Sequence, residues 1–254
     1  MNVFVYDGTF EGVLTAVFEA YERKLFPDSL VAEGEMLPLF YDNLVPITAD
    51  AAKADRVWRA LQKKLSPAGL SVVASVWLSE QPEAPMLLFR YVCKTVDAPQ
   101  SIELNFGDED VLLATQLARK VWKERSRIIQ FLRFQKAADG TYFAVIEPEY
   151  NVLALALPHF TDRFADQTWL IYDRRRRLGY YYDLHEVREV SFSEEDMLRF
   201  CGKPDDALLD SDELLFQKLW KTYFHAISIK ERANPRLHRQ NLPARFWKYL
   251  PEKY

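Results

Sequence analysis

Apolar residues recur along the chain with two different periods, and these periods predict where strands and helices lie. Asn2 to Tyr6 alternates apolar residues as a strand does, and Asp7 to Thr9 predicts a turn that caps a following helix. In that helix the apolar residues from Val13 to Leu25 recur at helical spacing, and Pro27 ends it. Residues 30–47 show no clear period and contain two prolines, which predicts an extended connection or short surface strands.

Four helices are predicted in the following stretch. Three lie between Asp50 and Val96, separated near Ser66-Pro67 and around Pro82 and Pro85. A longer helix opens at Asp108-Glu109-Asp110, where an acidic first turn suits the helix dipole. Towards its end this helix becomes basic, with seven Lys and Arg residues between Arg119 and Lys136 opposed by Glu124 alone. That basic end is either a solvated helix terminus matched to the dipole or a surface that contacts phosphates.

Short aromatic and β-branched runs then predict an antiparallel sheet. Residues 131–136 and 141–146 flank Asp139-Gly140, a hairpin turn, and residues 168–173 and 178–183 flank four arginines, Arg174 to Arg177. Residues 187–192 add another strand, and residues 150–165 form a helix that contains Pro158. The fold class predicted is α+β, with a central antiparallel sheet of four or more strands surrounded by helices.

The last sixty residues predict two helices and an arm. A short helix runs from Ser191 or Ser193 to Cys201, and residues 203–209 form the clearest boundary. A long helix follows, capped by Asp210 or Ser211. Its apolar stripe is expected to be buried and comprises Leu215, Phe216, Leu219, Trp220, Tyr223, Phe224 and Ile227. Beyond it, Asn234-Pro235 and Leu242-Pro243 predict an extended arm in which Phe246, Trp247 and Tyr249 anchor back onto the domain. The organisation predicted is 1–106, 107–209 and 210–254, as three regions or as one compact domain.

Composition narrows the class of protein. The chain has 254 residues, of which 49% are hydrophobic and 14% aromatic, so it can bury a core and disorder is not expected. Residues 1–10 lack the features of a signal peptide, and the apolar run 152–157 is far shorter than the roughly 20 residues of a membrane-spanning helix. We therefore expect a cytoplasmic protein without membrane contact.

Cysteine and glycine usage argue against several kinds of chemistry. Cys93 and Cys201 form no CxxC pair, so no disulfide framework, metal site or iron–sulfur cluster is predicted, and both are expected to be buried thiols. Gly8 and Gly12 are the only glycines close enough to suggest a loop, and they match neither a phosphate-binding loop nor a nucleophile elbow. No cofactor is predicted.

Charge is distributed unevenly. Residues 218–254 carry nine Lys and Arg against Glu231 and Glu252, a local charge of +7, while the whole chain is −4 and residues 1–217 therefore carry −11. Such a reversal indicates a polyanion or an acidic partner surface at the basic end. Arginines interleaved with aromatic rings suit nucleic acid, because cations neutralise phosphates while rings stack on bases.

A family resemblance adds to this picture. The segment from Ile229 to Leu250, with Asn234-Pro235-Arg236-Leu237 and Arg245-Phe246-Trp247-Lys248-Tyr249, resembles a bacterial family of uncharacterised DNA metabolism proteins. The start, from Tyr6 to Gly12, and the central His159-Phe160, Arg163-Phe164 and Trp169 to Asp173 carry the same resemblance, which spans nearly the whole chain. The resemblance implies a partnership with a radical-SAM DNA repair protein. It also implies a C-terminal region that occurs joined to uracil-DNA-glycosylase-like domains. It supplies no catalytic residues.

Three hypotheses follow. The first is a DNA-binding accessory protein in DNA repair or metabolism that positions DNA for a partner enzyme. Its expected DNA-binding residues are Arg119, Lys123, Arg127, Arg133, Arg163, Arg174, Arg175, Arg176, Arg177, Lys230, Arg232, Arg236, Arg239, Arg245 and Lys248. The second is an enzyme, a glycosylase or hydrolase, that acts on damaged DNA with a general base drawn from Asp7, Glu11, Asp162, Asp173 or His159. The third is a protein-interaction adaptor whose basic arm grips its enzyme partner.

Overall fold

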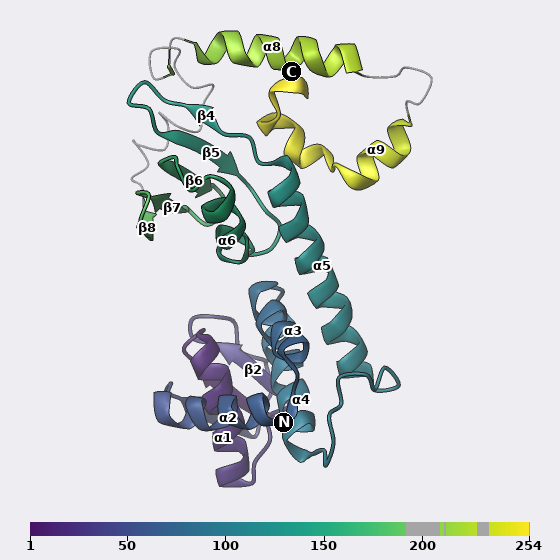
Figure 1. Ribbon diagram of the computed structural model, residues 1–254. Helices are drawn as coiled ribbons and strands as arrows, with labels where there is room; N and C mark the ends of the chain where they lie inside the picture. The colour runs from purple at the N-terminus through teal and green to yellow at the C-terminus, as the bar shows by residue number, and fades with distance from the viewer. Residues whose placement is uncertain (192–208, 211, 228–233, 254) are drawn as a thin grey trace. The chain divides into compact units, whose positions relative to one another are not determined.

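The computed structural model describes residues 1–191, 209–210, 212–227 and 234–253, and it has an α+β fold (Figure 1). The chain divides into two compact units, Met1–Trp122 and Lys123–Tyr254. This division falls inside one long helix. The sequence-based boundaries at residues 106 and 209 stay predictions.

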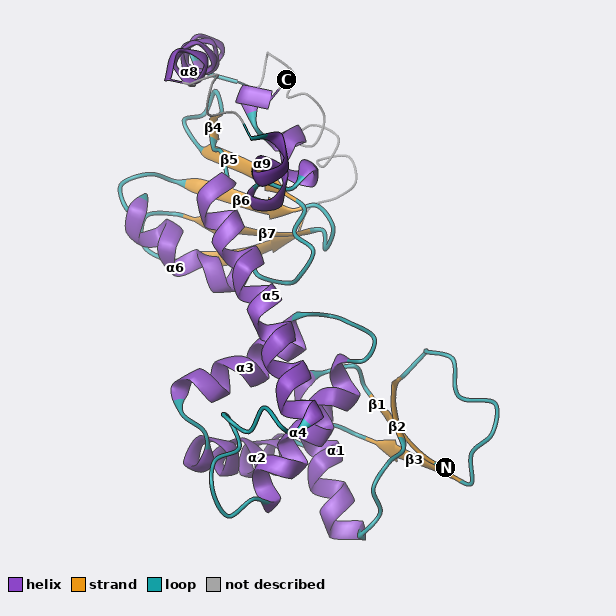
Figure 2. Ribbon diagram, turned by 90° about the vertical axis from the view of Figure 1, so that its right-hand side faces the viewer, coloured by secondary structure: helices purple, strands orange, loops and turns teal. Residues whose placement is uncertain are grey.

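The first unit contains a small parallel sheet (Figure 2). Strand β1 (Asn2–Tyr6) lies in its centre, between β2 (Ser29–Ala32) and β3 (Asn43–Ile47), and pairs in parallel with both. Helix α1 (Phe10–Arg23) begins where the sequence predicts, because the Thr9 hydroxyl accepts a hydrogen bond of 2.9 Å from the Gly12 amide. The segment without a period thus supplies two strands, as one of its two interpretations predicted.

Three helices follow β3 and match the predicted positions. They are α2 (Ala51–Lys64), α3 (Pro67–Leu78) and α4 (Ala84–Asp97). The Asp50 carboxylate caps α2 and the Ser66 hydroxyl caps α3, so each break in the helical pattern is also a helix start. Pro67 and Pro85, which mark the predicted breaks, lie in the first turns of α3 and α4.

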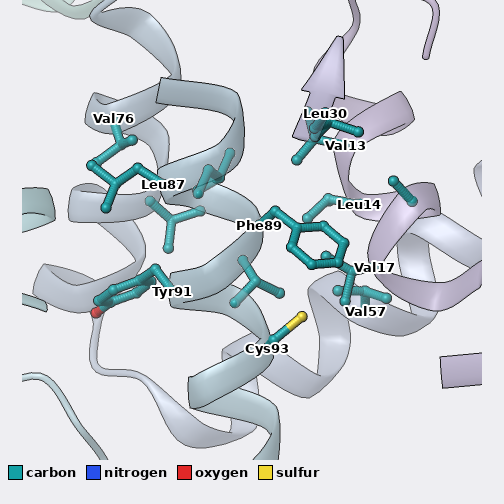
Figure 3. Packing of buried hydrophobic residues seen from close by; sticks show 14 of the residues in the cluster. Val13, Leu14, Val17, Leu30, Val57, Val76, Leu87, Phe89, Tyr91 and Cys93 are labelled. Carbon is teal, nitrogen blue, oxygen red and sulfur yellow. The ribbon is translucent and has the colours of Figure 1, made fainter. Parts of the chain in front are cut away.

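The core of the first unit includes the interface between α1 and α4 (Figure 3). Phe89 of α4 faces Leu14 and Val17 of α1, and all three are buried. Cys93 lies at the same interface, and burial raises the pKa of its thiol to about 12. For Cys93 the prediction of a buried thiol is confirmed, whereas Cys201 lies outside the described residues.

Helix α5 (Glu109–Phe131) also begins as predicted. The Asp108 carboxylate accepts hydrogen bonds from the amides of Asp110, at 2.9 Å, and Val111, at 3.2 Å. An acidic cap of this kind satisfies amides that have no partner within the helix and favours the positive end of its dipole.

The second unit contains a five-stranded sheet in the order β4-β5-β6-β7-β8. The strands are β4 (Gln135–Lys136), β5 (Tyr142–Ile146), β6 (Trp169–Asp173), β7 (Leu178–Tyr182) and β8 (Val187–Ser191). Both predicted hairpins, β4-β5 and β6-β7, are antiparallel as expected. Trp169 is fully buried in this unit and stacks on Tyr182 with ring centroids 5.3 Å apart.

The prediction of a wholly antiparallel sheet is wrong at one pair. Strands β5 and β6 are parallel, with Tyr142 opposite Trp169 and Ile146 opposite Asp173. Helix α6 (Leu153–Arg163) connects them and lies across the sheet (Figure 1), so the two strands run in the same direction. The sheet is therefore mixed.

The end of the chain also departs from the prediction. Helix α8 (Glu213–Ile227) forms as expected, but five members of its apolar stripe are exposed: Leu215, Phe216, Leu219, Trp220 and Tyr223. The prediction of a buried stripe is wrong for these five, because within the described chain the face of α8 that carries them is largely uncovered. The short helix predicted to end at Cys201 lies outside the described residues, apart from Ser191, which ends β8.

The predicted extended arm is helical where it is described. It consists of α9 (Pro235–Asn241) and two 3₁₀ turns, η3 (Ala244–Tyr249) and η4 (Pro251–Lys253). The Asn234 side chain accepts a 3.0 Å hydrogen bond from the Leu237 amide, and Pro235 occupies the first helical position. The Asn-Pro pair that suggested an extended segment is thus a helix cap followed by a helix-starting proline.

Candidate nucleic-acid interface

The carboxyl ends of two parallel strands meet at one edge of the five-stranded sheet. Strand β5 ends at Ile146 and β6 at Asp173, and these two residues lie opposite each other. The segments that follow are 147–150 and 174–177. We call this edge, with the side chains that contact it, the carboxyl edge. In sheets with parallel strands, ligands bind preferentially outside such ends.

The four arginines that follow β6 form a turn, and the Asp173 carboxylate holds the backbone of this turn in place. This carboxylate is 1% exposed and accepts hydrogen bonds from the amides of Arg175, at 2.9 Å, and Arg176, at 3.2 Å. The Arg176 guanidinium donates to the same carboxylate at 2.8 Å. Burial raises the pKa of Asp173 above its ordinary value, although the hydrogen bond from Arg176 opposes the shift. Asp173 therefore holds the turn and is not a free acid.

The arginine turn also reaches the segment that follows β5. Arg175 Nη1 donates to the Glu149 carbonyl at 2.9 Å, and Arg176 Nη1 donates to the Pro148 carbonyl at 3.2 Å. Arg176 is mostly buried, whereas Arg174, Arg175 and Arg177 are exposed. Arg176 thus stabilises the turn, and the other three arginines expose positive charge at the surface.

A buried carboxylate from α5 ties the C-terminal tail to the same edge. Glu124 is 1% exposed and accepts hydrogen bonds from Arg245 Nη2 at 2.5 Å, Arg127 Nη1 at 3.3 Å and the Glu149 amide at 3.0 Å. Arg127 donates in addition to the Gln240 carbonyl at 3.3 Å. Glu124 therefore joins α5, the segment after β5 and η3.

A second carboxylate secures η3. Glu147 pairs with the Lys248 ammonium and accepts a 3.1 Å hydrogen bond from the Tyr249 hydroxyl. The hydrogen bond from Lys248 is the main reason that the pKa of Glu147 is lowered, while burial is the main reason that the pKa of Tyr249 is raised. Phe246 is buried with its ring centroid 6.1 Å from that of Phe131. The prediction that the aromatic residues of the arm anchor it is confirmed for Phe246 and Tyr249.

Positive charge exceeds negative charge at the carboxyl edge. Its described carboxylates are Glu124, Glu147, Glu149 and Asp173, and its described cations are Arg127, Arg174, Arg175, Arg176, Arg177, Arg245 and Lys248. The carboxylates fix the positions of several cations, and the excess remains positive. Such a surface can hold an anion, since phosphate oxygens accept from guanidinium and ammonium groups.

The structure brings together some of the predicted DNA-binding residues and separates others. Arg127, the arginine turn, Arg245 and Lys248 all belong to the carboxyl edge. Arg133 instead pairs with Glu252 at 3.0 Å. The remainder have exposed side chains elsewhere, namely Arg119 and Lys123 on α5, Arg163 on α6, and Arg236 and Arg239 on α9. Lys230 and Arg232 lie outside the described residues.

The catalytic candidates are distributed over both units. Asp7 and Glu11 belong to the first unit, where Asp7 Oδ1 accepts from the Thr9 amide at 3.1 Å and the Thr9 hydroxyl at 2.7 Å. His159 and Asp162 lie on α6, and Asp173 is committed to the arginine turn. Within the described ranges, no group of three His, Cys, Asp or Glu side chains is placed to hold a metal ion. Across the same ranges, no helix is long and apolar enough to cross a membrane.

Sequence reasoning missed the acidic half of this surface. Glu124, Glu147 and Glu149 determine where the cations lie, yet none was a candidate. One signal was present, because Glu124 is the single acid in the basic end of α5. A lone acid among cations on a helix with an apolar face is well suited to bind arginines from elsewhere in the fold.

Comparisons with known proteins place the chain in a family. A search of curated proteins found no match. Among solved structures, the pGpG-specific phosphodiesterase PggH from Vibrio cholerae aligns over 89% of this chain and 99% of its own, with 14% sequence identity and a TM-score of 0.34. A TM-score this low does not establish a shared fold. Residues 82–252, more than half of the chain, match DUF4130, which is described as a domain of unknown function. The chain therefore belongs to the DUF4130 family.

Proposed function

We propose that this protein is a DNA-binding accessory protein that holds DNA by its phosphates at the carboxyl edge. The observation that carries the proposal is the arginine turn, whose backbone is fixed by the buried Asp173 while Arg174, Arg175 and Arg177 are exposed. Arginines held in place lose less conformational entropy on binding than arginines on a flexible loop. Their planar guanidinium groups suit phosphate oxygens.

The proposal assigns the chemistry to a partner. The candidate acids lie on separate elements, and Asp7 and Asp173 already accept hydrogen bonds within their own turns. The resemblance implies that the partner is a radical-SAM DNA repair protein, with a uracil-DNA-glycosylase-like domain as a second candidate. The chain's two cysteines are too few for the three-cysteine cluster motif of a radical-SAM enzyme.

Salt-dependent binding tests the proposal. The affinity of the full chain for labelled single-stranded and duplex DNA is measured by fluorescence anisotropy from 50 to about 300 mM salt, and the slope of log K against log salt counts the phosphates neutralised. Replacing Arg174, Arg175 and Arg177 together with Ala is expected to weaken binding. It should also make the slope shallower by about 2 to 3 if each contacts one phosphate.

A matched control removes three cations from another surface. Arg56, Arg59 and Lys63 are exposed on α2. Their replacement with Ala changes the net charge by the same amount and is expected to leave the slope unchanged. Salt-insensitive binding, or equal effects of the two triple variants, would contradict phosphate contact at the carboxyl edge.

A pull-down with the partner separates an accessory protein from an adaptor. If the chain bridges DNA and enzyme, it retains its own affinity for DNA when the partner is absent. If the complex persists after nuclease treatment and neither the chain alone nor the complex binds DNA, the basic surface grips the partner protein and the DNA-binding proposal fails.

A further inference from the structure

Helix α8 carries an exposed aromatic face beside the five-stranded sheet. Phe216 is 62% exposed, Tyr223 55% and Trp220 38%. Exposed aromatic side chains gathered on one helix face are uncommon on a monomer surface and indicate a binding site.

This face forms one wall of a pocket of about 980 Å³. Other walls come from Phe134, which follows α5, Tyr142 at the start of β5, and Pro251 of η4. The pocket is within the size range of sites for small organic ligands. Its lining includes five aromatic rings contributed by three separate parts of the chain.

Hydrogen bonds fix the orientation of the central ring. Trp220 Nε1 donates to Glu252 at 2.9 Å, and Arg133 Nη2 donates to the other oxygen of the same carboxylate at 3.0 Å. The Arg133 guanidinium lies 5.7 Å from the centroid of the Trp220 ring. Tyr223 lies next to Trp220, with centroids 5.8 Å apart. The orientation of the Trp220 ring is thus fixed by the protein itself.

Each charged side chain that lines the pocket has a hydrogen-bonding or ionic partner within the protein. Arg133 pairs with Glu252, and Lys136 pairs with Asp210 at 3.0 Å. Glu213 accepts from the Lys136 amide at 3.1 Å and from Gln217 Nε2 at 3.0 Å. Because these charged groups already have partners, the contact that the pocket offers a ligand is stacking on its exposed rings.

Two segments of the second unit run between the pocket and the carboxyl edge. Strand β5 begins in the pocket at Tyr142 and ends at the carboxyl edge at Ile146, about 13 Å away at ~3.3 Å per residue. The tail makes the same connection. Lys248 and Tyr249 of η3 bind Glu147, and Pro251 of η4 lines the pocket. A DNA strand that followed β5 from the carboxyl edge would reach these rings.

We propose that the α8 pocket binds the unpaired bases of single-stranded DNA by stacking them on Phe216, Trp220 and Tyr223. This assignment rests on the proposed function and adds that the preferred substrate has unpaired bases. Stacking on aromatic rings is sequence-tolerant, because every base has a flat face. The carboxyl edge supplies phosphate contacts and the α8 pocket supplies base contacts.

Three labelled probes of equal length test this inference: a mixed-sequence single strand, the same backbone with abasic sites in place of its bases, and a duplex. The wild-type chain is expected to prefer the base-bearing single strand. Phe216→Ala and Tyr223→Ala should each weaken binding of that strand about 5- to 150-fold, the range for losing one stacked base, and leave the abasic strand unaffected. Both residues are more than half exposed, so neither variant is expected to unfold. Phe40→Ala, which removes an exposed ring from the first unit, is the matched control.

The probes separate this inference from the proposed function. Equal affinity for the base-bearing and abasic strands, with a normal salt slope, would overturn the pocket assignment and leave phosphate binding intact. Failure to bind any probe would overturn both. If Phe216→Ala changes the oligomeric state in analytical ultracentrifugation without changing DNA affinity, the pocket is a protein interface and the assignment is wrong.

Discussion

Arg245 Nη2 lies 2.5 Å from Glu124 Oε2, although 121 residues separate the two in sequence. The carboxylate is almost completely buried in the second unit, and the arginine comes from η3 at the end of the chain. A buried charge needs a partner, since an isolated carboxylate is strongly disfavoured away from water. This ion pair therefore couples the fold of the tail to α5.

Arg245→Ala is expected to destabilise the second unit by about 3 kcal/mol, because Glu124 stays buried with Arg127 as its remaining charged partner at 3.3 Å. Urea unfolding followed by circular dichroism measures the change. Arg239→Ala removes an exposed arginine of α9 and should change stability by less than about 0.5 kcal/mol.

A double variant distinguishes an unpaired charge from lost packing. Glu124→Gln combined with Arg245→Met removes both charges and is expected to be more stable than Arg245→Ala alone. If the double variant is the less stable one, an unpaired Glu124 charge is not the main cost of Arg245→Ala. The contact of Arg245 with Phe246 and the pairing of Glu124 with Arg127 then contribute more.

Asp173→Ala is expected to release the arginine turn. The substitution removes acceptors for the amides of Arg175 and Arg176 and for the Arg176 guanidinium, and buried hydrogen bonds of this kind contribute about 1–3 kcal/mol each. Hydrogen exchange should show that both amides lose protection. Asp139→Ala, which removes an exposed acceptor of the Thr141 amide, is the control and should not alter exchange in the arginine turn. Unchanged protection in Asp173→Ala would show that other contacts hold the turn.

Local pattern predicted most of the helices and hairpins. Helix α1 and the three helices that follow have apolar residues at helical spacing, and α1, α2 and α3 also have polar caps. Those signals lie within a few residues of the element they define. The hairpin around Asp139-Gly140 is equally local. These elements were predicted correctly because neighbouring residues determine them.

Features that depend on distant residues were not predicted. Nothing in the separate sequences of β5 and β6 states that they pair in parallel, and a short helix between two strands was the one available sign. Helical spacing shows that α8 has an apolar face but not whether another element covers it. The ion pair between Glu124 and Arg245 was not predicted for the same reason, because the two residues come into contact only in the folded chain.

Asp108→Asn is expected to reduce the acid sensitivity of the protein. Hydrogen bonds from Lys94 are the main cause that lowers the pKa of Asp108 from its ordinary 3.8. A carboxyl whose folded pKa is lowered contributes stability that is present above pH 3.8 and is lost as pH falls through the folded pKa. The Asn variant keeps the capping oxygen but not the charge. It should therefore be less stable at pH 7 and lose less stability between pH 4 and pH 2, measured by urea unfolding.

The control for Asp108→Asn removes a carboxylate that does not pair with Lys94. Glu109→Gln lies in the same helix turn and is exposed. It is expected to follow the pH profile of the wild-type chain. Equal profiles for Asp108→Asn and the wild-type chain would show that the ion pair with Lys94 does not distinguish the folded from the unfolded state.

Gly12→Ala is expected to destabilise the first unit even though alanine favours a helix by about 1 kcal/mol over glycine. A Cβ at Gly12 would overlap Asp7 Oδ1 and lie 3.0 Å from the Tyr6 ring. Asp7 would have to move and give up its two hydrogen bonds to Thr9, each contributing about 1 kcal/mol. The net change should be about 1 kcal/mol of destabilisation in urea unfolding. Gly107→Ala is the control, because its Cβ would meet nothing closer than 3.5 Å.

Combining Gly12→Ala with Asp7→Ala tests the cause. Once the Asp7 side chain is removed, the alanine at position 12 meets less obstruction and its helix preference should make it neutral or stabilising. The two substitutions are therefore expected to be non-additive by about 1–2 kcal/mol, as residues in direct contact are. Additive effects would show that the Tyr6 ring, and not Asp7, is what excludes a side chain at Gly12.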